Sequence, residues 1–270
     1  MTTQFQQQAR QFRQLHTSAT PLILPNAWDA ISARVLELSG AQALATSSCA
    51  ISWAHGYADG GHLPLALHLQ SIAAIKRVTS QPLSVDVEDG YASHPQQVAK
   101  HVAAFVEAGA VAINIEDGQH SAELLVEKIL AIRAELGAEL YINARCDLLL
   151  QGQLQGAALV DEIVSRAALY QQAGADAIFL PGLHDLALIR QLGQHSVLPI
   201  NLMALPNLAP AAELAQAGVQ RISMGGFLLQ AALAQTQQLV QTSLASGRFQ
   251  PLFAQSLDYG SLNQALAGMN

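Results

Sequence analysis

The sequence predicts an α/β fold, a (β/α)8 barrel of the TIM type. Eight short apolar segments recur along the chain, a helical pattern follows each of them, and polar residues stand where most of the apolar segments end. Alternating strands and helices form parallel sheets, and eight such units in roughly 250 residues close into a barrel. A doubly wound open sheet is the alternative, but the even spacing and the number of units favour the barrel.

The strands are identified from apolar runs of the length found in parallel sheets. They are expected near residues 22–25, 43–48, 83–88, 111–116, 139–145, 177–181, 198–203 and 220–225. Five of them follow a glycine that ends the preceding helix, as in EAGAVAINIED and QAGADAIFLPG. The strands are almost wholly apolar, which is typical of strands buried on both faces.

The chain is expected to form a single domain over residues 1–270, because no low-complexity linker interrupts the pattern. Residues 2–16 have a helical pattern and are expected to cover the floor of the barrel. The tail at about 249–270 carries several large apolar side chains. Such a tail needs a partner surface, either on its own barrel or on a neighbouring subunit.

Composition excludes several classes of partner. The 270 residues are 51% hydrophobic and 12% charged, which is enough apolar material for one large core. Thirteen Lys and Arg against twenty Asp and Glu give a net charge of −7, and no basic run favours nucleic acid or an anionic membrane. Two cysteines make no disulfide framework, and the polar N-terminus lacks the apolar core of a signal peptide. We therefore expect a cytoplasmic protein.

Acidic residues gather at the ends of the third and fourth strands. In SVDVEDGYA, Asp86 and Glu88 are two residues apart and would face the same way on a regular strand, and Glu116 ends the next strand. A hard cation such as Mg²⁺ prefers oxygen ligands and takes one or two carboxylates directly. The alternative is that these acids cap helices or pair with Arg145. Three acids at neighbouring strand ends favour the metal.

Arg145, in INARCD, can hold a substrate carboxylate bidentately or form an internal ion pair with Asp117 or Asp147, and both interpretations stay open. TSSCA places Ser47, Ser48 and Cys49 at the end of the second strand, where hydroxyls and amides can bind a carboxylate or phosphoryl group.

The remaining candidates are single residues. Cys49 is interpreted as a small buried residue rather than a nucleophile. Asn201, at the end of the seventh strand, is expected to bind substrate. His120 is the best histidine candidate for a proton shuttle, because its loop borders the pocket. SMGGF, at residues 223–227, stands where barrels often bind phosphate, although two glycines alone are a weak signal.

An ordered set of motifs between about residues 21 and 249 resembles the isocitrate lyase/phosphoenolpyruvate mutase superfamily. The set comprises LPNAWDAISARVLE, SSCAISWAHGYADG, SVDVEDGYA, INIEDG, INARCD and GADAIFLPG. The resemblance implies Mg²⁺, or Mn²⁺ in its place, held directly by Asp86. Asp59, Glu88 and Glu116 would act on the metal through water, and Glu88 stands where several members have Asp.

The same resemblance implies roles around the metal. Ser47, with the backbone near Ser48 and Cys49, would receive the substrate carboxylate or phosphonyl group, and Arg145 would hold the other end. It also implies that the eighth helix is swapped between subunits of a homotetramer.

One departure from the superfamily narrows the expected activity. Its lyases carry a Lys-(Lys or Arg)-Cys-Gly-His gating loop after the fourth strand and its mutases carry a Lys and an Asn there, whereas this chain reads INIEDGQHSAELLVEKI. We expect a Mg²⁺-dependent lyase or decarboxylase that cleaves a C–C bond of a small 2-oxo or 2-hydroxy dicarboxylic acid (oxaloacetate- or methylisocitrate-like) through an enolate. Arg145 and Glu116 would serve catalysis, and His120 or a metal-bound water would supply the proton.

Three alternatives stay open. The first is a C–P bond enzyme of the phosphonopyruvate hydrolase or phosphoenolpyruvate mutase type. The second is a non-catalytic 2-oxo acid binding protein that kept the pocket and lost the gating loop. The third, a phosphate-binding isomerase that uses SMGGF, leaves the acidic cluster without a role.

Overall fold

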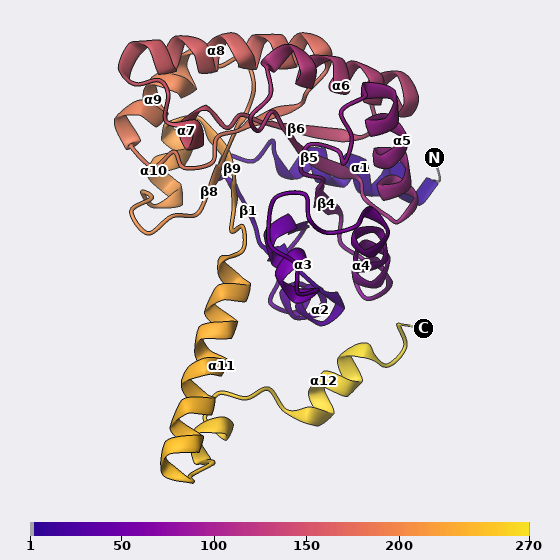
Figure 1. Cartoon of the computed structure of the whole chain (residues 1–270), viewed down its shortest axis with the longest axis vertical. Helices are drawn as coiled ribbons and strands as arrows, with labels where there is room; N and C mark the ends of the chain where they lie inside the picture. Colours follow the sequence, from indigo (N-terminus) through magenta and orange to yellow (C-terminus); the bar gives the residue numbers. More distant parts are fainter. Residues whose placement is uncertain (1–2, 270) are drawn as a thin grey trace.

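Nine parallel strands form one sheet that curls into a nearly closed barrel in a computed structural model that describes residues 3–269 (Figure 1). The strands are β1 (Leu22–Leu24), β2 (Asn26–Ala27), β3 (Leu44–Thr46), β4 (Leu83–Asp86), β5 (Ala112–Glu116), β6 (Tyr141–Arg145), β7 (Ala177–Phe179), β8 (Ile200–Met203) and β9 (Val219–Ser223). They lie in the order β1-β9-β8-β7-β6-β5-β4-β3-β2. The predicted TIM-type barrel is confirmed, and the carboxyl ends of its strands share one face.

The first predicted strand is divided into two pieces. β1 pairs with β9, with Leu24 opposite Ser223, whereas β2 pairs with β3 from Asn26 onward. Pro25 stands between the pieces and has no N–H to donate, so the ladder hydrogen bonds change partner there. The two pieces together join β9 to β3 and so complete the ring.

Helices cover the outside of the barrel. They are α2 (Ala30–Leu38), α3 (Ser48–Ala54), α4 (Leu65–Arg77), α5 (Pro95–Glu107), α6 (Ala122–Leu136), α7 (Leu148–Gln151), α8 (Gly156–Ala173), α9 (Leu186–His195) and α10 (Ala211–Gln216). In α5 the buried residues Val98, Val102 and Phe105 recur at helical spacing and pack in the main core with strand residues such as Ile113. This core lies between the helices and the outer face of the sheet.

A further helix, α1 (Thr3–Leu15), covers the floor of the barrel as predicted. Its buried residues Phe5, Ala9 and Phe12 share one face and pack in a second core with Leu24 and Tyr141 from inside the barrel. Residue 2 of the predicted helix lies outside the described residues. Helix α1 thus closes the end of the barrel opposite the carboxyl ends of the strands.

Two buried histidines make the stability of the fold depend on pH. His16 stacks on Tyr141 below the barrel, and His68 accepts or donates a hydrogen bond at Nδ1 with the Tyr91 hydroxyl. Burial lowers the pKa of each from the ordinary value of 6.5 to about 4. Between pH 6.5 and 4 the unfolded chain binds protons that the folded chain does not. For each histidine, the free energy of unfolding should therefore decrease by about 1.4 kcal/mol for every unit by which the pH is lowered in this range.

Urea unfolding measured from pH 7 to pH 4 tests this dependence. His68→Gln should remove about half of the slope that the two histidines produce. The exposed His195→Gln should leave the slope unchanged. An equal slope in the wild type and in His68→Gln would contradict the assignment.

The last helices leave the barrel. α11 (Phe227–Ser246) runs away from the other elements, and after the 3-10 turn η1 (Gln250–Phe253) the chain returns through α12 (Tyr259–Leu266) toward α2 (Figure 1). The Arg34 Nε donates to the Ala265 carbonyl over 2.9 Å. Leu229 is the buried residue of α11, whereas Leu244 is 82% exposed. Within residues 3–269, no helix combines the length and the apolar character needed to cross a membrane.

The tail is only partly covered by its own barrel. Leu266 and Met269 pack against the main core, but Phe253 and Leu257 are exposed. The exchange of the helix after the last strand stays a prediction.

Candidate active site

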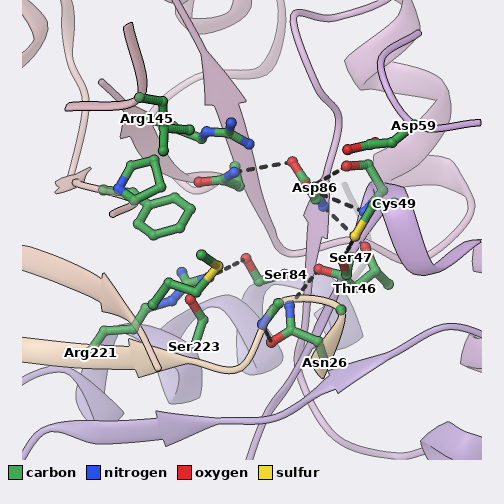
Figure 2. A pocket seen from close by; sticks show the side chains of 18 residues that line it. Asn26, Thr46, Ser47, Cys49, Asp59, Ser84, Asp86, Arg145, Arg221 and Ser223 are labelled. Atoms are coloured by element: carbon green, nitrogen blue, oxygen red, sulfur yellow. Dashed lines mark hydrogen bonds between the residues drawn. The ribbon is translucent and has the colours of Figure 1, made fainter. Parts of the chain in front are cut away.

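A cavity of about 210 Å³ opens at the carboxyl ends of the strands (Figure 2). Its polar lining comes from both sides of the ring and includes Asn26, Thr46, Asp86, Asn114, Arg145 and Ser223. These residues are far apart in sequence. The barrel brings them together because all six lie on its parallel strands, and Thr46, Asp86, Arg145 and Ser223 each end a strand.

Asp86, the last residue of β4, is held in one orientation. Its Oδ2 accepts hydrogen bonds from the Ser48 backbone N–H over 3.2 Å and from the Ser48 hydroxyl over 2.8 Å. Its Oδ1 accepts from the Asn114 Nδ2 over 3.1 Å, and Asn143 in turn donates to the Asn114 Oδ1 over 3.0 Å. These bonds hold the carboxylate in place in the cavity.

Ser47, Ser48 and Cys49 line the same cavity, next to Asp86, as the sequence predicted. The Ser47 hydroxyl and the Cys49 thiol lie 3.1 Å apart. Burial raises the pKa of the Cys49 thiol, which disfavours the thiolate that a nucleophile needs.

A second hollow adjoins the cavity and contains the other candidate acids. Glu88, Glu116, His120 and Asp147 line it, and Arg145 lines both spaces. Asp59, from the loop between α3 and α4, lines the first cavity and lies near Asp86 in Figure 2. The four predicted metal residues therefore divide into two pairs, Asp59 with Asp86 and Glu88 with Glu116.

The expectation that Asp86 and Glu88 face the same way on one regular strand is wrong, because β4 ends at Asp86. Glu88 has a left-handed backbone with φ of 52°, which is uncommon for a residue other than glycine. The Tyr91 hydroxyl donates to its Oε1 over 3.0 Å. Burial raises the pKa of Glu88, and the charge of Asp86 adds to this effect. Asp89 belongs to the turn that follows, since its Oδ1 accepts from the Tyr91 N–H.

Arg145 bridges two carboxylates. Its Nη1 lies 2.7 Å from the Glu116 Oε2, and its Nε donates to the Asp147 Oδ1 over 2.7 Å. The predicted internal pair is therefore right for Asp147 and wrong for Asp117. Burial raises the pKa of Glu116 to about 8, although the Arg145 charge acts in the opposite direction.

Asp117 instead organises a buried network behind the site. Its Oδ2 accepts from the Arg166 Nη1 and from the Tyr170 hydroxyl, each over 2.6 Å. Its Oδ1 accepts from the Asp147 N–H over 2.9 Å. The network thereby fixes the backbone of Asp147, whose carboxylate accepts from Arg145.

Asp117→Asn should lower the free energy of unfolding by about 3 kcal/mol, because the largely buried Arg166 loses its buried counter-charge and keeps only the more exposed Glu162. Tyr170→Phe removes one hydrogen bond to the same carboxylate and should cost about 1 kcal/mol. Urea denaturation of the three proteins measures both effects. Equal losses in the two variants would show that the charge of Asp117 is unimportant.

Besides Glu88 and Glu116, two further predicted residues lie outside the first cavity. His120 occupies the short loop between β5 and α6, its side chain is 51% exposed, and its Nε2 lies 4.0 Å from the Asp89 Oδ2. Asn201 is buried on β8, and neither atom of its amide group has a hydrogen-bond partner within residues 3–269.

The sequence reasoning singled out neither Asn114 nor Arg221, although both line the cavity. Asn114 stands between Ile113 and Ile115, and a polar side chain between apolar strand residues is the signal that could have found it. Arg221 follows Gln220, and its signal is a charged residue within a predicted buried strand. Asn26 explains why SMGGF is a poor phosphate site. The Asn26 Oδ1 already accepts from the Met224 and Gly225 N–H groups over 2.8 and 3.0 Å.

Among the described residues, no three His, Cys, Asp or Glu side chains converge closely enough to hold a metal by themselves. This arrangement differs from a cage of protein ligands. It suits a cation that keeps several waters and takes one or two carboxylates directly.

The family model described as phosphoenolpyruvate phosphomutase matches residues 12–244. The chain belongs to the phosphoenolpyruvate phosphomutase family. A Mycobacterium tuberculosis protein described as uncharacterized is 35% identical over 82% of this chain and 84% of its own length. Oxaloacetate decarboxylase 1 of Pseudomonas fluorescens is 30% identical over 80% of this chain and 78% of its own.

Solved structures of other enzymes have the same fold as this member of the phosphoenolpyruvate phosphomutase family. 2,3-Dimethylmalate lyase, described as a PEP mutase/isocitrate lyase superfamily member, has a TM-score of 0.82 and 25% identity, covering 99% of this chain and 95% of that chain. A phosphonopyruvate hydrolase in complex with oxalate and Mg²⁺ shares the fold, with a TM-score of 0.84 and 23% identity over 96% and 94% of the two chains. The predicted superfamily is confirmed, and with it the expectation of an enzyme.

Proposed function

We propose that the chain is a Mg²⁺-dependent C–C lyase that decarboxylates a small 2-oxo diacid, with oxaloacetate as the first candidate. The observation that carries the proposal is the fixed Asp86 carboxylate, which shares a cavity with Arg145. Membership of the family and the 30% identity with an oxaloacetate decarboxylase support this choice of chemistry.

Asp86 would hold the metal directly and Asp59 would reach it through water, since both carboxylates line the first cavity. Bound Mg²⁺ supplies a Lewis acid that polarises the ketone oxygen. The Ser47 hydroxyl, with the backbone near Cys49, would orient the substrate carboxylate, because the Ser48 hydroxyl and N–H already donate to Asp86. Asp86 keeps its own direction because Ser48 and Asn114 hold it.

Arg145 and Glu116 have different roles: Arg145 stabilises negative charge, and Glu116 donates a proton. Loss of CO₂ from a 3-carboxyl group leaves an electron pair on the adjacent carbon as an enolate, and the Arg145 guanidinium stabilises that charge. Because burial raises the pKa of Glu116 to about 8, its carboxyl group carries a proton for much of the time at neutral pH. Glu116 can donate this proton to the enolate carbon and recover one from solvent through the second hollow. This assigns the proton to Glu116 rather than to the exposed His120.

Magnesium-dependent CO₂ release from oxaloacetate, measured against the spontaneous rate, tests the proposal. Activity should disappear with EDTA and return with Mg²⁺ or Mn²⁺. Phosphonopyruvate is the matched probe for the C–P alternative. Release of phosphate from phosphonopyruvate without CO₂ release from oxaloacetate would replace the proposal, and tight oxalate binding without turnover of either acid would favour a non-catalytic binder.

We also propose that the protein assembles as a homotetramer in which α11 packs on a neighbouring barrel. The exposed side chains of Leu233, Val240 and Leu244 on α11 support this, because they need a covering surface. Sedimentation velocity measures the mass in solution, and a monomer at micromolar concentration would contradict the assembly.

A further inference from the structure

Arg221 lies on the floor of the first cavity with most of its guanidinium group unpaired. The residue is 3% exposed, and its Nη2 makes one long contact of 3.4 Å to the Ser84 hydroxyl. Neither Nε nor Nη1 has a hydrogen-bond partner within residues 3–269. Burial lowers the pKa of Arg221 to about 10, so the group is still charged at neutral pH. A buried charge without a counter-ion is costly to a fold, and its retention calls for an anionic partner.

The position of Arg221 relates it to the proposed metal site. Ser84, which it contacts, and Asp86 are two residues apart on β4 and face the same way. The guanidinium group therefore lies one layer of side chains below Asp86, about 7 Å along the strand. Figure 2 shows Arg221 beside Ser84 and Ser223, away from Asp59. This separation suits the two ends of a short-chain diacid.

The charges in the cavity also favour Arg221 as the residue that binds a second carboxylate. The two arginines that line the cavity are Arg145 and Arg221. Arg145 already holds Glu116 and Asp147 at 2.7 Å, whereas no acidic side chain among the described residues pairs with Arg221. A second carboxylate on the substrate would therefore pair with the Arg221 guanidinium on the floor of the cavity rather than with Arg145, which is already paired.

Asn201 lies at the same level. It stands opposite Arg221 in the pairing of β8 with β9, it is 1% exposed, and both atoms of its amide group lack a partner among the described residues. The amide group of Asn201 does not line the cavity, so it lies beside Arg221 without giving that residue a counter-charge.

We propose that Arg221, with Ser84, forms an anion subsite on the cavity floor that binds the distal carboxylate of a diacid substrate. The subsite makes the enzyme select diacids over monoacids of the same shape. It rests on the proposed function only for the class of ligand, and its test is a binding measurement that needs no turnover.

Calorimetry with the full-length protein and Mg²⁺ compares two matched 2-hydroxy acids. Malate carries a distal carboxylate, and 2-hydroxybutyrate carries a methyl group in its place, whereas both can chelate the metal through the same hydroxy acid end. The wild type should bind malate at least about tenfold more tightly, since a charge-assisted hydrogen bond is lost in the other acid. Oxalate, which is too short to span both positions, serves as the control for the metal end.

Arg221→Met should abolish the preference for malate and leave oxalate affinity within about threefold of the wild type. Arg221→Lys should keep part of the preference, because it keeps the charge without the fork. The exposed Arg190→Met is the matched control and should change nothing. Melting temperatures show whether each variant is folded.

Three results would overturn the subsite. They are equal binding of malate and 2-hydroxybutyrate by the wild type, an unchanged preference in Arg221→Met, and an equal loss of oxalate and malate affinity in that variant. The last result would assign Arg221 a purely structural role. If Arg221→Met does not fold, the wild-type comparison and Arg221→Lys still decide. Failure of the wild type to decarboxylate oxaloacetate would contradict the proposed function and leave this result standing.

Discussion

Replacing Asp86 by asparagine should abolish Mg²⁺-dependent decarboxylation of oxaloacetate, lowering kcat/KM by about a thousandfold or more. The substitution removes the charge that would hold the metal and keeps the shape of the side chain. An asparagine can still accept from Ser48 or Asn114 through its one oxygen, so the fold should persist. Steady-state kinetics with a Mg²⁺ titration measure the loss, and calorimetry with Mg²⁺ and oxalate measures binding without turnover.

Asp59→Asn is the matched control, because Asp59 lines the same cavity and is assigned a role through water. It should weaken the apparent Mg²⁺ affinity by about 10- to 100-fold, the usual effect of an outer partner of a metal site. Asp86→Asn with undiminished Mg²⁺-dependent turnover would refute the metal assignment. A larger loss in Asp59→Asn than in Asp86→Asn would exchange the two roles.

Arg145→Lys should lower kcat by about a hundredfold while the protein stays folded. Arg145 contacts Glu116 through Nη1 and Asp147 through Nε, and a lysine ammonium cannot make both contacts in that geometry. The charge near the enolate would then be misplaced, and Glu116 would lose part of its counter-charge. Single-turnover CO₂ release measures the chemical step, and thermal melting measures stability.

The control for this experiment is Glu116→Gln in the wild type and in Arg145→Lys. If Glu116 supplies the proton, Glu116→Gln alone should slow formation of pyruvate more than release of CO₂, because protonation follows cleavage. If Arg145 acts only through its pair with Glu116, the double variant should be no slower than Glu116→Gln alone. An unaltered kcat in Arg145→Lys would exclude Arg145 from the stabilisation of charge.

The fold was predictable because its signals are local and repeated. A helix-ending glycine followed by an apolar run recurs along the chain, and each run became a strand of the parallel sheet. The break at Pro25 was not predicted, because LILPNA has the apolar character of one strand. The missing proline N–H has visible consequences only when the partners on both sides of the strand are known.

The candidate site was predictable only where a polar residue ends a strand. Asp86 and Arg145 were found in this way, whereas Glu88 was given the wrong geometry because its left-handed backbone cannot be read from a single Glu. Arg221 was missed because strands buried on both faces carry no alternation that separates inside from outside. The internal pairing of Arg145 was left open because choosing among Glu116, Asp117 and Asp147 requires side-chain positions.

The closing contact of the barrel has a consequence for the order of folding. Asn26 holds the backbone of Met224 and Gly225, which are 198 and 199 positions further along the chain. On the ribosome, β1 emerges long before β9, and until β9 appears one edge of the growing sheet has no ladder partner. Such distant pairings fold slowly and expose edges that aggregate. The barrel should therefore complete its ring only near the end of synthesis, and chains truncated before β9 should depend on chaperones for solubility.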